Sequence, residues 1–422
     1  GYIYSIPKSG YYVSDLSGIP VHQTEYTSEP YKAEEQGKDS RTAKAGDKVL
    51  LTGGDNAFIA DFTSNQTEHA AFPFSIWNKT MRAVMNDYQE EMMINPPCGG
   101  VMELRKSISG YLKEFCAMYV RPEQIIIGAG TEYLYSILIQ LLGRNVCYGV
   151  ENPGYPKIAK IYRSMGVKYE YIDLDEEGTS AKKLEEKKVD IMHISPSHHF
   201  PTGMVMPISK RYELLGWVTR EKERYIIEDD YDSELRLAGK PIPSLQSIDV
   251  SGKVIYINTF AKTLCSTVRI SYMVLPEALA EKYYRELSFY SCTVSNFEQY
   301  TLAAFMNAGA FEKHINRLRN YYQHKRDLIL STFLREPLGK YITISEEDSG
   351  VHFLMHVNTS VSEQEILLKT KAKGIRLATL SSFYNAEQKD SRYENTYVMN
   401  YSFVDCDRLE YVAQTLYKII HP

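Results

Sequence analysis

Short apolar runs alternate with amphipathic stretches through the middle of the chain. The apolar runs have the length and the β-branched content of buried strands. The stretches between them, such as 132–142 and 208–221, repeat apolar positions at helical spacing. The expected strands cover residues 146–150, 168–172, 191–195, 224–228, 254–259 and 269–275. Strands and helices in alternation predict an α/β fold with a mostly parallel sheet and helices on both of its faces.

A second pattern follows the last of these strands. We expect long helices over 277–288 and 299–333, and then an α+β segment that runs to the end of the chain. That segment is too short to be an independent enzyme, so we interpret it as a smaller satellite domain. The sequence therefore predicts a large domain at 49–335, which includes an N-terminal arm, and a small C-terminal domain at 336–422.

The first residues have a different character. Two β-rich runs on either side of a Pro-Lys-Ser-Gly turn predict a hairpin within residues 1–14. Residues 15–48 are expected to be a linker, because 28–48 carries ten charges in twenty-one residues and almost no large apolar side chain. A long surface loop of the following domain is the alternative for that stretch.

Charge and cysteine usage narrow the class of protein. Lys and Arg number 48 against 53 for Asp and Glu, a formal net charge of −5, so no strongly basic field exists to hold nucleic acid by phosphate neutralisation. No apolar run approaches the roughly 18 to 20 residues that cross a bilayer, so no membrane partner is expected. The start lacks a secretory signal pattern, and the six cysteines show no CxxC or framework spacing. We expect reduced thiols and a cytoplasmic protein.

Four groups of residues are candidates for chemistry because they follow expected strands, where open α/β sheets bind ligands. An acidic turn begins at Asp229, Lys262 follows the strand at 254–259, and a turn carries Tyr155. Gly128 and Gly130 lead into a helix whose N-terminal N–H groups could cradle an anion. Taken singly, these are a solvated or metal-binding acidic turn, a surface lysine, a plain turn and a weak glycine signal. Together they are the parts needed to hold pyridoxal phosphate (PLP), and no metal site is expected.

Here the chain resembles a fold-type-I PLP protein, specifically the aminotransferase-like half of the MocR branch of GntR-type transcriptional regulators. The resemblance covers about residues 60–276 specifically and continues more weakly to the C-terminus. Its strings are FPFSIW at 72–77, LRKSISGYL at 104–112, ENPGYP at 151–156, SPSHHFPTGMVMP at 195–207, IIEDDYDSELR at 226–236 and VIYINTFAKTLCSTVRISYMVLP at 254–276. It implies a fold-type-I aminotransferase-like large domain and a smaller α+β C-terminal domain.

The resemblance also implies residue roles. Lys262 would carry the cofactor as an internal aldimine, which requires a neutral amine and hence a lowered pKa. Asp229 would pair with the pyridine nitrogen, while Tyr231 would contact the phenolic oxygen and Tyr155 would stack on the ring. The phosphate would be held by Gly130, Thr131, Glu132, Thr259 and Arg269.

The chain departs from the family pattern at several positions. His199 stands where the family usually has Gln, so its expected polar contact with the cofactor ring rests on a different side chain. Ala261 removes a hydroxyl that could touch the phosphate. Val398 aligns with the position where aminotransferases carry an arginine for the substrate carboxylate. Lys157 is a candidate substitute for that arginine, or else a solvated turn residue, which leaves the amine ligand open.

In this family a winged-helix DNA-binding domain precedes the aminotransferase-like half. Residues 1–14 resemble the last hairpin, or wing, of such a domain, and the recognition helices before it are absent from this chain, so we expect no sequence-specific DNA binding by these residues alone. An ordinary hairpin of an ordinary aminotransferase is the alternative. The resemblance implies a homodimeric, PLP-binding module that senses an amine or amino-acid effector. A working class I/II aminotransferase for an amino acid and a 2-oxo acid is the second hypothesis, with full turnover in doubt.

Overall fold

The computed structural model describes residues 3–6, 10–13, 58–64, 66–238, 242–348, 350–385 and 393–421. The chain forms two units, which divide after Gly54. In the first unit, strands β1 (Ile3–Ile6) and β2 (Gly10–Val13) pair antiparallel, with Ile3 opposite Val13, so the predicted hairpin is present. Its assignment as a wing remains a prediction, and the expected linker lies outside the described residues.

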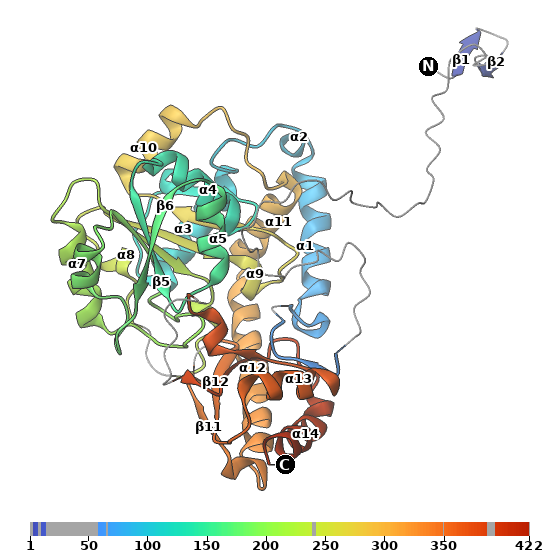
Figure 1. The fold of residues 1–422 in the computed structure, drawn as a ribbon. Coiled ribbons are helices and arrows are strands. Elements are labelled where there is room, and N and C mark those ends of the chain that lie inside the picture. The colour runs from blue at the N-terminus through green and yellow to red at the C-terminus, as the bar shows by residue number, and fades with distance from the viewer. Residues whose placement is uncertain are drawn as a thin grey trace, which may run out of the picture. The chain divides into compact units, whose positions relative to one another are not determined.

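A seven-stranded sheet is the centre of the second unit (Figure 1). Its strand order is β4-β10-β9-β8-β7-β5-β6, and β10 (Ser271–Val274) is the strand that runs antiparallel to its neighbours. The predicted α/β fold with a mostly parallel sheet is therefore confirmed. The other strands are β4 (Ile125–Gly128), β5 (Cys147–Asn152), β6 (Lys168–Asp173), β7 (Ile191–Ile194), β8 (Tyr225–Asp230) and β9 (Val254–Thr259).

Helices cover both faces of this sheet. Successive residues of a strand point to opposite faces, and both sets are apolar here, so each face needs a covering layer. In β9, Tyr256 packs into one hydrophobic cluster and Ile255 and Ile257 into another. One face carries α1 (Phe74–Asp87), α3 (Met102–Cys116) and α11 (Asn296–Asn307). The other carries α4 (Thr131–Leu142), α5 (Pro156–Ser164) and α10 (Glu277–Glu286), while α6 (Ala181–Glu186), α7 (Ile208–Val218) and α8 (Leu245–Ile248) flank the β6-to-β8 region.

The prediction of one long helix over 299–333 is wrong, because the structure has two helices there. Helix α11 ends at Asn307, and α12 (Ala310–Phe333) begins after Gly309, whose φ is +64°. A left-handed backbone residue cannot continue a right-handed helix, and glycine adopts it without a Cβ clash. The chain therefore changes direction there.

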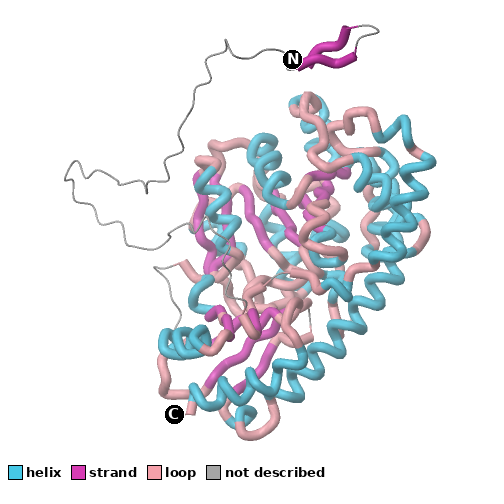
Figure 2. The backbone as a smooth tube through the Cα atoms, turned by 90° about the vertical axis from the view of Figure 1, so that its right-hand side faces the viewer, coloured by secondary structure: helices cyan, strands magenta, loops and turns pink. Residues whose placement is uncertain are grey.

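A second, four-stranded sheet forms the C-terminal part of the unit, and Figure 2 shows its strands apart from those of the large sheet. Its order is β11-β12-β15-β14, with helices α13 (Glu363–Ala372) and α14 (Leu409–Ile420) in the same hydrophobic core. The strands are β11 (Ile342–Ser345), β12 (His352–Val357), β14 (Ala378–Thr379) and β15 (Thr396–Asn400).

Two segments outside 336–422 also build this C-terminal core. Strand β3 (Ala60–Asp61) pairs parallel with β13 (Ile375–Arg376), and Phe62 is fully buried in the same cluster. The second half of α12 contributes Phe333 to it, whereas Phe311 at the start of the helix packs in the core of the large sheet. The arm predicted as part of the large domain thus packs, at 58–64, with the small one.

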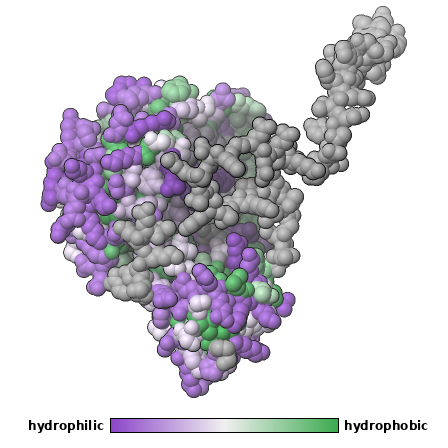
Figure 3. All heavy atoms as spheres, viewed as in Figure 1, coloured by the Kyte–Doolittle hydropathy of each residue, from purple (hydrophilic) through white to green (hydrophobic). Residues whose placement is uncertain are grey.

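We next describe the hydropathy of one face of the molecule and the length of its apolar helices. Figure 3 shows a largely hydrophilic face over α7, with apolar residues in small patches. Within the described part of the chain, no helix is both long and apolar enough to cross a bilayer.

Candidate functional site

A cavity of about 230 Å³ lies at the carboxyl ends of the central strands of the large sheet. It collects residues from both sheets, since His352 of β12 and Asn400 of β15 line it, together with Val351 just before β12. All the site residues predicted from the sequence line it, except His199: they are Gly130, Thr131, Glu132, Tyr155, Lys157, Asp229, Tyr231, Thr259, Lys262 and Arg269. The structure thus places residues that are far apart in sequence around one space.

Asp229 is a buried residue of this cavity. Strand β8 runs further than the sequence suggested and includes Asp229 and Asp230, because both pair with residues of β9. The Asp229 carboxylate is buried: its Oδ2 accepts a hydrogen bond from the hydroxyl of Tyr135, and His193 Nε2 lies 3.4 Å from the same oxygen. Oδ1 is buried without a hydrogen-bond partner among the described residues.

Lys262 approaches the cavity from the neighbouring strand. It lies in the short helix α9 (Phe260–Thr263), which begins as β9 ends at Thr259. The Thr259 side chain caps that helix by accepting a hydrogen bond from the Ala261 N–H at 3.2 Å. Burial lowers the pKa of the Lys262 amine, and the carboxylate of Asp232 acts in the opposite direction. The expected direction of this pKa shift is therefore present.

A cradle for an anion forms where α4 begins. Gly130 is the N-cap residue with φ +91°, and a Cβ there would collide with the guanidinium of Arg269. Arg269 donates to Glu132 Oε2 at 2.7 Å, and Lys157 pairs with Oε1 of the same carboxylate. Burial acts to raise the pKa of Glu132, but the hydrogen bonds from these two cations hold it at about 2. Two cations and the N-terminus of α4 thus face the same end of the cavity.

Tyr155 also lines the cavity and is 43% exposed. It is the N-cap of α5, after the turn predicted from ENPGYP, and its ring lies edge-on to Phe200 with 5.9 Å between centroids. Burial raises the pKa of its hydroxyl, which Lys157 partly offsets, so this ring is neutral. An aromatic face is therefore available beside Lys262 and Asp229.

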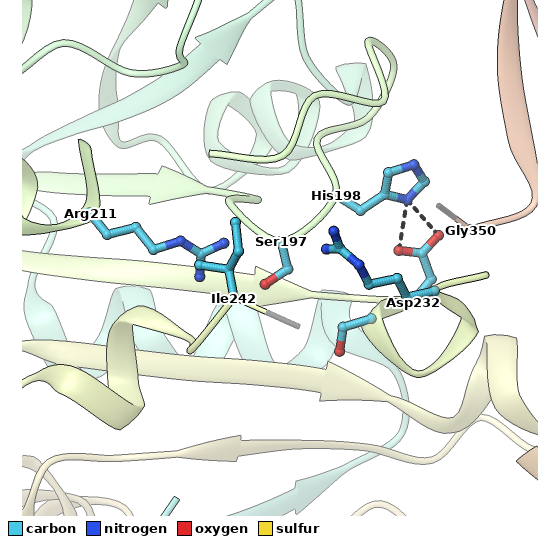
Figure 4. A pocket seen from close by; sticks show the side chains of 8 residues that line it. Ser197, His198, Arg211, Asp232, Ile242 and Gly350 are labelled. Carbon is cyan, nitrogen blue, oxygen red and sulfur yellow. Dashed lines mark hydrogen bonds and ion pairs between the residues drawn. The ribbon is translucent and has the colours of Figure 1, made fainter. Parts of the chain in front are cut away.

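His198, Asp232 and Gly350 line a second cavity, and Figure 4 shows the imidazole of His198 facing the carboxylate of Asp232. The His198 Nδ1 lies 2.9 Å from both oxygens of Asp232 and 3.2 Å from the hydroxyl of Tyr231. The His198 ring packs on His352 of β12, with 4.6 Å between centroids. Gly350 has φ +64°, and a Cβ there would collide with both His198 and Asp232. The two sheets therefore meet at this histidine and carboxylate.

His199 is the one predicted site residue that is not among the described residues lining the cavity. Its Nδ1 lies 2.7 Å from the Thr202 hydroxyl, and its Nε2 lies 3.5 Å from Glu151. Burial lowers the pKa of His199 to about 3 and raises that of Glu151 to about 8, so both groups are neutral at pH 7. Its contact with a cofactor ring remains a prediction.

Tyr135 and His193 are functional candidates that sequence reasoning missed. Tyr135 sits one helical turn into α4, on the face toward the sheet, and His193 is the polar residue of the apolar strand β7. A buried tyrosine and a buried imidazole in otherwise apolar elements were the available signals. These signals indicate that each side chain needs a hydrogen-bond partner. They do not identify Asp229 as that partner, because the contact depends on the order of the strands in the sheet.

The cavity suits PLP on grounds visible in this structure. The buried, unpartnered Oδ1 of Asp229 is positioned to accept a hydrogen bond from a protonated ring nitrogen. Gly130 leaves space for a backbone anion cradle beside Arg269. Lys262, whose amine has a pKa lowered by burial, lines the same cavity. The donor set matches an aldehyde, a pyridine and a phosphate on one small molecule.

Comparison with known proteins first gives the class. The model of the aminotransferase class I and II family matches residues 59–388. Among solved structures, an archaeal alanine:glyoxylate aminotransferase superposes with a TM-score of 0.74 at 21% identity, covering 87% of this chain and 91% of that one. The kynurenine aminotransferase of Pyrococcus horikoshii superposes with a TM-score of 0.72 at 22% identity, covering 87% and 92%. These two likenesses establish the fold.

Sequence relatives then narrow the class. The HTH-type transcriptional regulator YdeL of Bacillus subtilis is 36% identical over 384 residues, which are 91% of this chain and 79% of that protein. The probable rhizopine catabolism regulatory protein MocR of Rhizobium meliloti is 30% identical over 322 residues, 76% and 65% of the two chains. The chain belongs to the MocR-type family of transcriptional regulators, whose aminotransferase-like domain has the class I and II fold.

Proposed function

We propose that this chain is the ligand-sensing and dimerisation module of a MocR-type regulator, that it binds PLP on Lys262, and that an amine effector displaces the lysine. One observation carries the proposal: Lys262, the Arg269 cradle and the Asp229 carboxylate, whose Oδ1 has no hydrogen-bond partner among the described residues, line one cavity. The relatives are regulators of the helix-turn-helix type, which supports DNA as the eventual target of the response. Homodimerisation and a cytoplasmic location belong to the same proposal.

The chain's own residues prepare the cavity for this task. Bound PLP supplies an aldehyde that captures primary amines and a ring that withdraws electrons. Burial keeps a larger share of Lys262 neutral and therefore nucleophilic, while Asp232 limits that effect. Asp229 holds a proton at the ring nitrogen, and Arg269 with the first turn of α4 holds the phosphate.

The junction at His198 gives the proposal a route for a response. His198 is bound to Asp232, which acts on Lys262, and packs against His352 of the C-terminal sheet. A ligand that changes the charge on Lys262 therefore changes the field at the contact between the two sheets. Such a ligand shifts the conformation only by the difference in its affinity for the two states.

Reconstitution with PLP tests the proposal directly. The purified chain should show the visible absorption of a lysine-bound cofactor, and Lys262→Ala should abolish it. The matched control is Lys282→Ala, which removes a lysine that donates to the Leu141 carbonyl of the large domain and does not line the cavity. Unchanged absorption in Lys262→Ala would refute the assignment of the lysine.

Amines then separate the regulator from the aminotransferase. A stoichiometric spectral shift on addition of an amine, without continued formation of a carbonyl product, is the result expected of a sensor. Sustained exchange between an amine and a 2-oxo acid would instead establish a transaminase.

A further inference from the structure

An aromatic recess of about 80 Å³ adjoins the cofactor cavity. Its wall combines the strand end and turn of β5, the start of α5 and residues 382–385 of the C-terminal part. Tyr155, Ile158, Ser195 and Phe200 line both spaces, so the recess lies next to the position where we place the cofactor. Tyr155, which we expect to stack on the cofactor ring, belongs to both spaces, whereas none of the described residues that we assign to the phosphate lines the recess.

Aromatic rings form one side of this recess. Phe200 lies edge-on to Phe383, with 5.2 Å between centroids, and edge-on to Tyr155 on its other side. Val398, the residue at the position of the aminotransferase arginine, is 3% exposed and packs with Leu354. The side chains around that position are thus apolar, and they include Phe200, Phe383, Tyr384 and Tyr393.

The charges near the recess leave little to attract a carboxylate. No lysine or arginine is among the described residues that line it. In the adjoining cavity, Lys157 and Arg269 are both bound to Glu132, and Arg269 faces the phosphate cradle. Burial raises the pKa of Glu151, the acid of the recess wall, to about 8, which leaves it mostly uncharged at pH 7.

We propose that this recess receives the uncharged aromatic body of an arylalkylamine effector, whose primary amine reaches Lys262. Edge-to-face contacts with Phe200 and Phe383 and the loss of exposed apolar surface supply the affinity. A ligand carboxylate in the same place would be buried without a cationic partner, which is costly. The proposal rests on the function proposed above and adds the chemical class of the ligand.

A series of three amines tests the selectivity on the PLP-loaded wild-type protein. The probes are 2-phenylethylamine, L-phenylalanine, which has the same ring and adds a carboxylate on the carbon that bears the amine, and 4-aminobutyrate, which has no ring. Shifts in the cofactor absorption give an apparent Kd for each. We expect 2-phenylethylamine to bind at least about tenfold more tightly than the other two, as burial of one aromatic ring without a charge implies. Tighter binding of either carboxylate ligand would overturn the proposal.

Phe383→Ala locates the effect in the recess. Phe383 is half-buried in a short 3-10 helix, Leu380–Phe383, and lines the recess but is not among the described residues that line the cofactor cavity. The affinity for 2-phenylethylamine relative to methylamine should fall about tenfold on loss of the ring. Phe403→Ala, which removes a 44%-exposed ring elsewhere in the C-terminal part, is the control and should leave that ratio unchanged. An unchanged ratio in Phe383→Ala would exclude the recess.

Glu132→Gln tests the charge argument from the other direction. Loss of the carboxylate releases Lys157 from its ion pair, so a cation becomes available at the cavity wall. The ratio of the apparent Kd for 4-aminobutyrate to that for 2-phenylethylamine should fall about three- to tenfold, in line with a partly exposed ion pair. A constant ratio would contradict the argument that the ion pair with Glu132 prevents Lys157 from binding a ligand carboxylate.

The failures of the two proposals are distinguishable. If the reconstituted protein shows no absorption from a lysine-bound cofactor, the proposed function is refuted, whichever amines bind in the recess. A protein that shows this absorption and responds to methylamine, but ranks the carboxylate amines first, keeps the proposed function and loses the arylalkylamine assignment.

Discussion

Two adjacent carboxylates at the end of β8 face opposite sides of the same sheet, and the described residues satisfy one oxygen of the first but both oxygens of the second. Asp229 faces the cofactor cavity with Oδ1 unpartnered among the described residues. Asp230 faces the other side, where its oxygens accept from the Ser233 backbone and hydroxyl and from the Tyr256 hydroxyl at 2.8 Å. Both are more than nine-tenths buried.

The difference shows how to separate a ligand group from a structural one within a single acidic turn. A buried acceptor that the fold itself satisfies stabilises the turn, whereas a buried acceptor left open is costly unless a ligand completes it. Burial by itself does not distinguish the two residues. We therefore assign Asp229 to the ligand and Asp230 to the fold, and the predictions below test that division.

Matched alanine substitutions should have the largest effect. Asp229→Ala removes the charged partner of the ring nitrogen and should weaken PLP binding at least about a hundredfold, the loss expected for a buried charge-assisted hydrogen bond. Asp230→Ala leaves Tyr256 and Ser233 without an acceptor and should lower the free energy of unfolding by about 1–3 kcal/mol. Spectral titration with PLP and urea denaturation measure the two quantities.

The division fails if the two variants exchange behaviour. A hundredfold loss of PLP affinity in Asp230→Ala, in protein that remains folded by circular dichroism, would place that carboxylate in the binding site. Unchanged PLP affinity in Asp229→Ala would show that the open oxygen is not completed by the cofactor.

The sequence did not predict which face of the sheet each of these two carboxylates occupies. The acidic turn, Lys262 and Tyr155 could be predicted, because each follows an apolar run that forms a strand. The sheet and most of its strands followed from the same pattern. Because the strand ends at Asp230 rather than at residue 228, both aspartates lie inside it, and the alternation of side chains along a strand places them on opposite faces.

Other parts of the site depend on contacts that no local pattern records. Tyr135 and His193 meet Asp229 only because α4 and β7 lie beside β8 in the fold. The aromatic recess needs Phe383, which is distant in sequence from Phe200. The break at Gly309 was visible as a glycine, but glycine inside a helical pattern is often tolerated, so the pattern did not determine it.

The Asp230 face should also respond to pH through Glu234. Burial, followed by the charge of Asp230, raises the pKa of Glu234 to about 8, against about 4.3 for an unperturbed glutamate. Between these values the folded state holds more protons than the unfolded state, so its stability falls as the pH rises. Glu234→Gln removes this dependence, and the difference in unfolding free energy between wild type and variant should change by up to about 1.4 kcal/mol per pH unit.

Urea denaturation from pH 5 to pH 8 measures that difference. The wild type should lose stability relative to Glu234→Gln throughout this range. Glu123→Gln, a change at an exposed glutamate of the same domain, is the control and should give a curve parallel to the wild type. Parallel curves for Glu234→Gln as well would contradict the raised pKa.

Tyr135→Phe should have the smallest effect and sharpens the comparison most finely. The variant keeps the ring in its buried position and removes only the hydroxyl that donates to Oδ2 of Asp229. His193 remains 3.4 Å from that oxygen, so the carboxylate is less well held but still present. PLP affinity should fall about three- to tenfold, as for one hydrogen bond to a charged acceptor. Tyr148→Phe, which removes a hydroxyl that donates to the Gly143 carbonyl at 2.9 Å, should leave PLP affinity unchanged. If the two variants bind PLP alike, the hydroxyl of Tyr135 does not orient Asp229 toward its ligand.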